Sequence, residues 1–340
     1  MNSWSYYSSP AIAIRFRYVA LASAGRLQAL LAVLLAIALT ISLGQPTVCN
    51  AGQSGAQASE DSAEKDSAND VRVITYNIRF LNRGDGPDHW DSRVDSVAEM
   101  IRSGDVIGLQ EATRPQIDDL LQRLPEFDWY GVGRDDARDA GEFSPIFWRK
   151  DRFKSGQSGT FWLGPDTTAV GKPAWEARIP RICSWVTLQP IAGDGNPTGA
   201  AFAVFNTHFD HQSGLARLNS AKLMLEKIAE IAADLPVIVM GDLNCRPDSQ
   251  PIAVLTAPSA SNDTSKTVRL VDSITQSETK PQGPTGTWNG FKQIDPEGRI
   301  DYVLVRPNFP RVLSHLTADP KTAAGRFASD HLPVVVVVQP

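Results

Sequence analysis

From residue 71 onward, hydrophobic positions follow two alternating periodicities. Short apolar runs that are rich in valine and isoleucine, or are interrupted by single polar residues, predict strands at 71–80, 106–109, 130–132, 145–148, 182–188, 201–207, 236–240, 300–305 and 333–338. Between several of these runs, apolar residues recur three and four positions apart, which predicts helices near 94–101, 113–124 and 213–233. Strands that alternate with amphipathic helices predict an α/β fold.

We expect the region 71–340 to form one domain. No internal repeat occurs at a fixed period, and no stretch of linker-like composition divides this region. Hydrophobic residues make up 42% of the 340-residue chain, which is enough for a sizeable core. The economical interpretation is therefore a single domain over 71–340.

The N-terminal region has the order of an export signal. Arg15, Arg17 and Arg26 precede an uncharged apolar stretch at 29–43, and small and polar residues follow up to Ala51. The stretch is short for a membrane span of about 20 residues, so we expect cleavage after Ala51 and no integral membrane domain thereafter. Residues 1–51 are thus predicted to direct the protein to the periplasm or the exterior. The alternative is an uncleaved segment that anchors the protein to the membrane.

Residues 52–70 are rich in Ser, Ala, Asp and Glu and predict a disordered spacer. Removal of residues 1–51 leaves 30 basic and 38 acidic residues, a net charge of −8. An acidic chain is a poor candidate for tight binding along duplex DNA, which relies on many basic contacts to phosphates. Of the three cysteines, Cys183 and Cys245 remain after cleavage, and either one disulfide or two free thiols fits this composition.

Polar residues with catalytic chemistry lie at or just beyond the ends of the predicted strands. They are Asn77, Glu111, His208, Asp242, Asp301 and the pair Asp330-His331. Strand ends in such folds present their side chains to a common crevice. Hydrolysis of a phosphate ester needs carboxylates for a divalent cation, a base for water, and donors around the developing charge. The strand-end residues supply each of these types.

Six short motifs carry a resemblance to a known family: TYNIR (75–79), LQE (109–111), NTHFDH (206–211), GDLN (241–244), RIDYVLV (299–305) and SDHLPV (329–334). In this order the chain resembles the endonuclease/exonuclease/phosphatase superfamily over nearly all of 71–340. The resemblance implies a DNase I-like four-layer α-β-β-α sandwich, in which helices flank two central mixed sheets. It also implies one or two Mg²⁺ or Mn²⁺ ions and hydrolysis of a phosphodiester or phosphomonoester.

Two carboxylates are candidate metal ligands. Glu111 stands at a strand end, where a hard cation that keeps several waters can be held, and Asp330 joins the metal shell directly or through water. Asn77 carries no charge and cannot protonate, so near a metal we expect it to orient water or contact the phosphate.

Five residues are candidates for the catalytic steps themselves. Asp242 takes the proton of the attacking water or holds a second metal, and Asn244 holds the phosphate or the nucleophile. By the family pattern Asp301 orients His331, which serves either as a charge stabiliser or as a base. His208 is expected to reach a phosphate oxygen. His89 is interpreted as a surface or structural residue, and the role of His211 stays open.

Substrate choice rests on weaker signals. Arg178 and Arg181 are candidate phosphate contacts, and Trp162, Trp175 and Trp288 could offer flat faces to a base or sugar. The run at 141–153 is similar to a strand of the carbon catabolite repressor deadenylase-like branch.

This similarity favours cleavage of RNA or DNA fragments or nucleotides in a 3′–5′ exonuclease-like mode. A phosphatase acting on an inositol or sugar phosphate, a sphingomyelinase-like phosphodiesterase and a non-catalytic phosphoester-binding protein are the alternatives. We expect a monomer with no stable protein partner.

Overall fold

The computed structural model describes residues 69–257, 268–307, 309 and 311–339. The predicted export signal at 1–51 and residues 52–68 of the predicted spacer lie outside the described residues. Within the described parts of the chain, no helix combines the length and the apolar character needed to cross a membrane.

Two sheets of six strands each form the centre of the part of the chain that the structure describes. The first sheet has the strand order β11 (Arg311–Thr317), β12 (Val334–Gln339), β1 (Val71–Asn77), β2 (Val106–Gln110), β4 (Ile146–Arg149) and β3 (Phe127–Tyr130). The second has the order β5 (Phe153–Trp162), β6 (Ile182–Pro190), β7 (Phe202–His208), β8 (Val237–Asp242), β10 (Asp301–Val305) and β9 (Val271–Asp272). Both sheets are mixed, because β1 is parallel to β2 and β7 is parallel to β8, whereas the other pairs are antiparallel.

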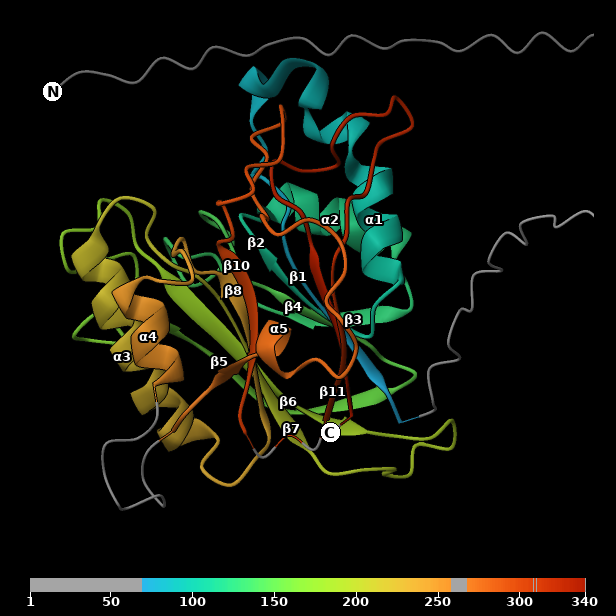
Figure 1. The fold of residues 1–340 in the computed structure, drawn as a ribbon, viewed down its shortest axis with the longest axis vertical. Helices are drawn as coiled ribbons and strands as arrows, with labels where there is room; N and C mark the ends of the chain where they lie inside the picture. The colour runs from blue at the N-terminus through green and yellow to red at the C-terminus, as the bar shows by residue number, and fades with distance from the viewer. Residues whose placement is uncertain (1–68, 258–267, 308, 310, 340) are drawn as a thin grey trace, which may run out of the picture. The chain divides into compact units, whose positions relative to one another are not determined.

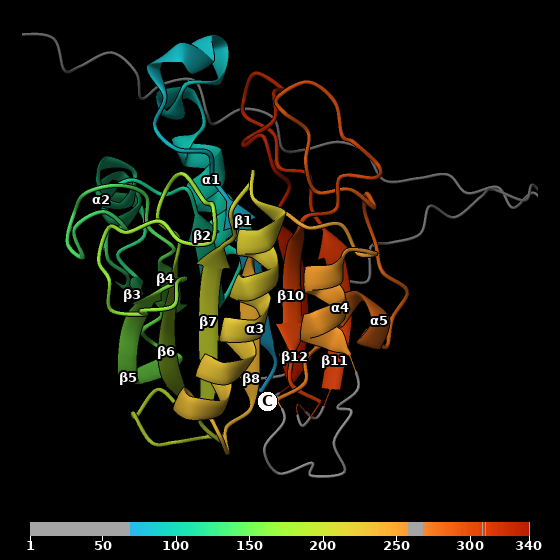
Figure 2. The ribbon, with the colours of Figure 1, turned by 90° about the vertical axis from the view of Figure 1, so that its left-hand side faces the viewer.

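Helices cover the outer face of each sheet, as Figures 1 and 2 show. The first sheet is covered by α1 (Val94–Arg102) and α2 (Arg114–Arg123), and the second by α3 (Gly214–Ile231) and α4 (Gln250–Thr256). Among the described residues, one apolar cluster lies between the two sheets and one lies under each helical layer. This confirms the four-layer α-β-β-α sandwich. Two 3-10 segments, Arg83–Asp88 and Trp90–Ser92, and the short α5 (Ser273–Gln276) complete the described elements.

The central strands carry hydrophobic residues at both odd and even positions because both of their faces are buried. In β1, Val71 and Val73 pack against the second sheet, whereas Ile74 and Tyr76 pack under α1 and α2. Side chains of a strand alternate between its two faces, so a strand between two apolar layers needs hydrophobic residues at odd and even positions. The continuous pattern of 71–77 follows from this position.

A buried polar bridge joins the two sheets below the strand ends. Gln110 Nε2 donates to Asn206 Oδ1 at 2.6 Å, and Asn206 Nδ2 donates to the carbonyl oxygens of Leu109 and Pro145 at 2.7 and 2.8 Å. A Cβ atom at Gly108 would lie 2.7 Å from Asn206 Oδ1, closer than real Cβ contacts allow. Glycine at this position therefore permits the close approach of the sheets.

The strands that the sequence pattern missed are all at or next to sheet edges. β5 is rich in serine and glycine and mostly exposed, and β9 and β11 also lie at the sheet ends. The run 141–153 is not one strand, because β4 ends at Arg149 and β5 begins at Phe153. Cys183 and Cys245 are buried free thiols and do not form a disulfide with each other. Of the two alternatives that the composition allowed, the structure has the two free thiols.

Candidate active site

The strand ends of both sheets bring most of the predicted residues together at one end of the sandwich. Asn77 ends β1, Glu111 follows β2, His208 ends β7 and Asp242 ends β8. Asp301 begins β10 and is directly opposite Asp242 in the antiparallel ladder. In Figures 1 and 2 the long loops before β10 and β12 extend from this same end. The loop before β12 carries Asp330 and His331.

A cavity of about 280 Å³ opens above these strand ends. The predicted residues that line it are Glu111, Arg181, His208, Asp242, Asn244, Asp330 and His331. Asn77 and Asp301 are buried and reach the lining residues through hydrogen bonds. The structure thus groups nine of the ten residues predicted for the site.

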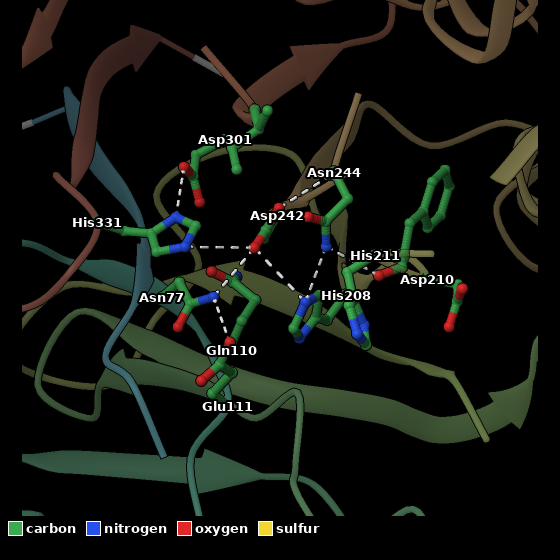
Figure 3. Close-up of polar contacts among 12 residues, drawn as sticks. Asn77, Gln110, Glu111, His208, Asp210, His211, Asp242, Asn244, Asp301 and His331 are labelled. Carbon is green, nitrogen blue, oxygen red and sulfur yellow. Dashed lines mark hydrogen bonds and ion pairs between the residues drawn. The ribbon is translucent and has the colours of Figure 1, made fainter. Parts of the chain in front are cut away.

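Asn77 connects carboxylates from the two sheets (Figure 3). Its Nδ2 donates to Glu111 Oε1 at 3.1 Å and to Asp242 Oδ2 at 3.0 Å. The Asn77 Oδ1 atom accepts from the backbone N–H of Arg79, and Glu111 Oε2 accepts from that of Phe80. A single buried amide therefore fixes the orientation of both acids.

Backbone strain accompanies these side chains. Arg79, Glu111 and Asn244 have φ angles of 58°, 59° and 47°, in the left-handed region that non-glycine residues rarely adopt. Each residue lies one or two positions beyond a strand end. Strained conformations of this kind persist where the surrounding contacts hold them, and they cluster at functional sites.

Asp242 occupies the centre of the site. It is 1% exposed, its Oδ1 accepts from the backbone N–H of Asn244 at 2.9 Å, and its Oδ2 lies 3.5 Å from His208 Nε2 and 3.8 Å from His331 Nε2. Burial, together with the charge of Asp301, raises the pKa of Asp242 to about 7. A carboxyl group with this pKa can accept and release a proton near neutral pH.

His331 is held in its charged form by two carboxylates. Its Nδ1 lies 2.9 Å from Asp301 Oδ2. Burial alone would lower the pKa of His331, but the charges of Asp301 and Asp242 outweigh it and raise the pKa well above its usual value. The imidazolium is therefore a cationic donor that faces Asp242 through Nε2.

His208 has the opposite charge state. Asn244 Nδ2, which also donates to the carbonyl of Phe209, lies 3.1 Å from His208 Nε2, so Nε2 accepts and the proton is on Nδ1. Burial and the nearby Arg181 charge lower the pKa of His208 well below its usual value. The site therefore combines one neutral and one charged imidazole.

The donor set fits a divalent cation. Glu111 and Asp330 line the same cavity, and burial with the added charge of Glu111 raises the pKa of Asp330. Crowded carboxylates of this kind are relieved by a hard cation with oxygen ligands. Atoms of Asp242, Asp301 and His331 also lie within 4.8 Å of one another, but the Nδ1 of His331 is already engaged by Asp301. Glu111 and Asp330 are the better metal candidates.

Arg178 is the predicted site residue that the structure leaves outside the cavity. Its side chain is exposed, whereas Arg181, three residues later, is 5% exposed and lines the cavity. Among the tryptophans in the described part of the chain, only Trp288 lines the cavity, with 43% exposure, and Trp162 is buried in the core. His89 is partly exposed and lies outside the cavity lining.

Sequence reasoning missed Glu142 and Arg79 and left His211 undecided, although all three line the cavity. Glu142 receives two hydrogen bonds from Arg134, at 2.7 and 3.0 Å, and burial raises its pKa. This acid stands three residues before the predicted strand at 145–148, as Asp330 stands before 333–338. The same strand-end rule could have found Glu142.

Comparisons with known proteins agree with the fold described above. Residues 74–331 match the model of the Endonuclease/Exonuclease/phosphatase family. An endonuclease/exonuclease/phosphatase from Bacteroides vulgatus is 34% identical, with 79% of this chain and 98% of that chain covered and a TM-score of 0.71. A mannosyl-6-phosphatase from Bacteroides thetaiotaomicron is also 34% identical, over 79% and 99% of the chains, with a TM-score of 0.68.

The catalytic domain of human Nocturnin with bound sulfate is similar in fold, at 19% identity over 79% and 93% of the chains and a TM-score of 0.57. None of the curated proteins compared with the sequence matches it.

Proposed function

Because the chain belongs to the endonuclease/exonuclease/phosphatase family, whose members are phosphoesterases, we propose that it is a divalent-metal-dependent phosphatase acting on a small phosphorylated sugar. The observation that carries the hydrolytic part is the bonding of Asn77 to both Glu111 and Asp242 at the base of one cavity. The candidate metal ligand Glu111 and the candidate proton acceptor Asp242 thus accept hydrogen bonds from the same side-chain amide.

Asp242 is the proton acceptor for the attacking water in this proposal. Its pKa of about 7 suits a base that works near neutral pH, and the Asn77 and Asn244 donors hold its two oxygens in fixed directions. Asn244 contacts both Asp242 and His208. Its backbone N–H donates to Asp242, and its side-chain amide donates to His208, so it fixes the position of the base relative to this histidine.

The two histidines act on the phosphate. His331 carries a positive charge and His208 a neutral N–H donor, and both line the cavity beside Asp242. Phosphoryl transfer builds negative charge on the phosphate oxygens in the transition state, and preorganised donors stabilise that charge. Asp301 keeps His331 charged and fixes the direction of its ring.

Glu111 and Asp330 would hold Mg²⁺ or Mn²⁺ beside these donors. When bound, the ion supplies further neutralisation of the phosphate charge and lowers the pKa of a bound water.

The choice of a small sugar phosphate rests on the cavity and on one comparison. A cavity of about 280 Å³ lies at the lower end of the volumes of ligand pockets, which suits one small ester. The 34% identity to a mannosyl-6-phosphatase, over 99% of that chain, supports the same class. The acidic charge of −8 over 52–340 gives little support to long nucleic acids. We further propose that residues 1–51 direct export.

Trp288 favours a second candidate, a phosphodiesterase acting on nucleotides or nucleic acid fragments. Its side chain is 43% exposed and lines the cavity, where an indole could stack on a base.

Hydrolysis assays on the purified protein with Mg²⁺ or Mn²⁺ decide between the candidates. The substrates are hexose phosphates, inositol phosphates, sphingomyelin, mononucleotides and single-stranded RNA and DNA, and the control is Asp242→Asn, which keeps the shape of the side chain. We expect release of inorganic phosphate from a hexose phosphate, reduced at least about 100-fold in the variant. Cleavage of polynucleotides alone would favour the phosphodiesterase. Tight binding of an ester without any turnover would instead indicate a binding protein.

A further inference from the structure

Arg93 is a buried arginine that lies outside the lining of the catalytic cavity. It directly precedes α1 and is 1% exposed. Within the described parts of the chain its side chain forms no salt bridge, and its Nη2 atom has no hydrogen-bond partner. A guanidinium keeps its charge at physiological pH, and a buried cation without a carboxylate partner costs stability. Arg93 is therefore an unfavourable residue for stability alone, and its remaining contacts need a reason.

The Arg93 side chain donates three hydrogen bonds among the described residues, and each goes to a backbone carbonyl. Nε donates to the carbonyl of Asp88 at 2.6 Å, and Nη1 donates to those of Ile78 and Ala328 at 2.9 and 2.8 Å. Ile78 is the first residue after β1, and Ala328 belongs to the loop before β12. A single nitrogen atom of Arg93 thus joins the end of β1 to the loop that carries Asp330.

Two aromatic rings pack against the Arg93 guanidinium. Its Cζ atom lies 5.4 Å from the ring centroid of Trp90 and 5.2 Å from that of Phe291. At separations below about 6 Å, an aromatic face attracts such a cation. Phe291 belongs to the loop before β10, in which the backbone N–H of Asn289 donates to the carbonyl of Asp330 at 2.8 Å. Arg93 therefore also contacts the second segment that holds the backbone of Asp330.

From these contacts we infer that Arg93 is a positioning residue for Asp330, one of the two candidate metal ligands. It fixes the loop before β12 against the end of β1, where Asn77 orients the other candidate ligand, Glu111. Arg93 thereby sets the separation between the two carboxylates. Supporting hydrogen bonds of this kind commonly change metal affinity or activity about 10- to 100-fold. The inference rests on the metal site of the proposed function and adds the residue that supports it.

Arg93→Lys tests the inference, because it keeps the positive charge but loses the planar fork that reaches several carbonyls. We expect the affinity for Mg²⁺ or Mn²⁺, measured by calorimetric titration, to fall at least about 10-fold. The metal concentration needed for half-maximal turnover should rise in parallel. KM for a hexose phosphate at saturating metal should stay within about twofold of the wild type, because Arg93 does not line the cavity. Unchanged metal affinity in this variant would overturn the inference.

Arg306→Lys is the matched control. Arg306 follows the end of β10 that is remote from the site, and it likewise donates to three backbone carbonyls, those of Ala232, Ala233 and Leu235, at 2.7, 2.9 and 2.9 Å. The control loses hydrogen bonds of the same kind, and its metal affinity should stay within about twofold of the wild type. Equal losses of metal affinity in Arg93→Lys and Arg306→Lys would show a general effect of destabilisation and would also overturn the inference.

Phe291→Leu provides a second test if Arg93→Lys does not fold. It removes one aromatic face from the guanidinium but keeps an apolar side chain and the three hydrogen bonds of Arg93. Phe291 is only partly buried, so we expect this variant to fold. Its metal affinity should fall about two- to fivefold, as the loss of one cation–π contact predicts. An affinity equal to that of the wild type would contradict the positioning role.

Failure of the proposed function has a different signature. If the wild type binds neither ion in the titration and hydrolyses its substrate without one, the metal site of the proposed function fails, and the role of Arg93 fails with it. If the wild type binds metal and Arg93→Lys binds it equally well, only the inference about Arg93 fails.

Discussion

The Nδ1 atom of His331 lies 2.9 Å from Oδ2 of Asp301, and both side chains are buried. The pair crosses from the loop before β12, in the first sheet, to the start of β10, in the second. The ion pair therefore depends on correct packing of the two sheets, and it sets both the charge and the direction of the imidazole.

Asp301→Asn should change the pH dependence of turnover. The Asp301 charge raises the pKa of His331, so its removal lowers that pKa, and the imidazole loses its proton at a lower pH. We expect kcat to fall at least about 100-fold at neutral pH and the alkaline limb of the profile to move toward acid. An unchanged profile with reduced stability would contradict the role of Asp301.

Removal of the metal should abolish activity. Glu111 and Asp330 are the candidate ligands, so dialysis against a chelator is expected to stop hydrolysis, and Mg²⁺ or Mn²⁺ should restore it. Glu111→Gln removes a charged ligand and should raise the metal concentration needed for half-maximal activity. Calorimetric titration of the metal into wild type and variant provides a measurement that does not depend on turnover. Equal affinities would exclude Glu111 as a ligand.

Gly108→Ala should destabilise the packing of the two sheets. The new methyl group would lie 2.7 Å from Asn206 Oδ1 and 2.9 Å from the terminal methyl of Met240, so the sheets must separate or the polar bridge must break. We expect a loss of about 1–3 kcal/mol in the free energy of unfolding. Thermal or denaturant unfolding measures it. Gly193→Ala, where a Cβ meets nothing within 4 Å, is the control and should unfold like the wild type.

His315 should make the protein less stable at acidic pH. Its buried ring is bonded to Ser273 through Nδ1 at 3.0 Å. Burial, together with the Arg299 charge and against the Asp272 charge, lowers the pKa of His315 to about 4. The unfolded chain, with a histidine pKa of about 6.5, binds the proton first as the pH falls. Stability from this group is therefore complete above about pH 6.5 and decreases toward pH 4, by up to about 3 kcal/mol.

Denaturant unfolding of wild type and His315→Gln between pH 4 and 7 isolates this effect. As the pH decreases, the free energy of unfolding of the wild type should fall relative to that of the variant. A constant difference would show that His315 titrates normally in the folded protein.

The central strands and most of the site could be predicted because both are local properties of the sequence. Runs such as 71–77 carry hydrophobic residues at both odd and even positions, and Asn77 and Asp242 stand at the ends of such runs. The start of α2 could likewise be predicted, because Thr113 and Gln116 have the spacing of a capping box. Each of these signals is contained within a few residues.

The burial of Arg181 could not be predicted in this way. Arg178 and Arg181 are equivalent in the sequence, and only the packing against Asp210 and His211 distinguishes the buried arginine from the exposed one. Edge strands were missed for a related reason. β5 is exposed on much of its length, so no hydrophobic alternation marks it.

The pairing of β1 with β12 has a consequence for biosynthesis. Val71 opposes Val338 in this ladder, and Ser329 donates to the backbone carbonyl of Asn77 at 2.7 Å. Among the described strands, β1 is thus the first to be synthesised, and it pairs with the last, β12, which lies between β1 and β11. Until residues 329–339 emerge, the nascent chain lacks both this strand and His331, so the proposed site cannot assemble before that segment has been made.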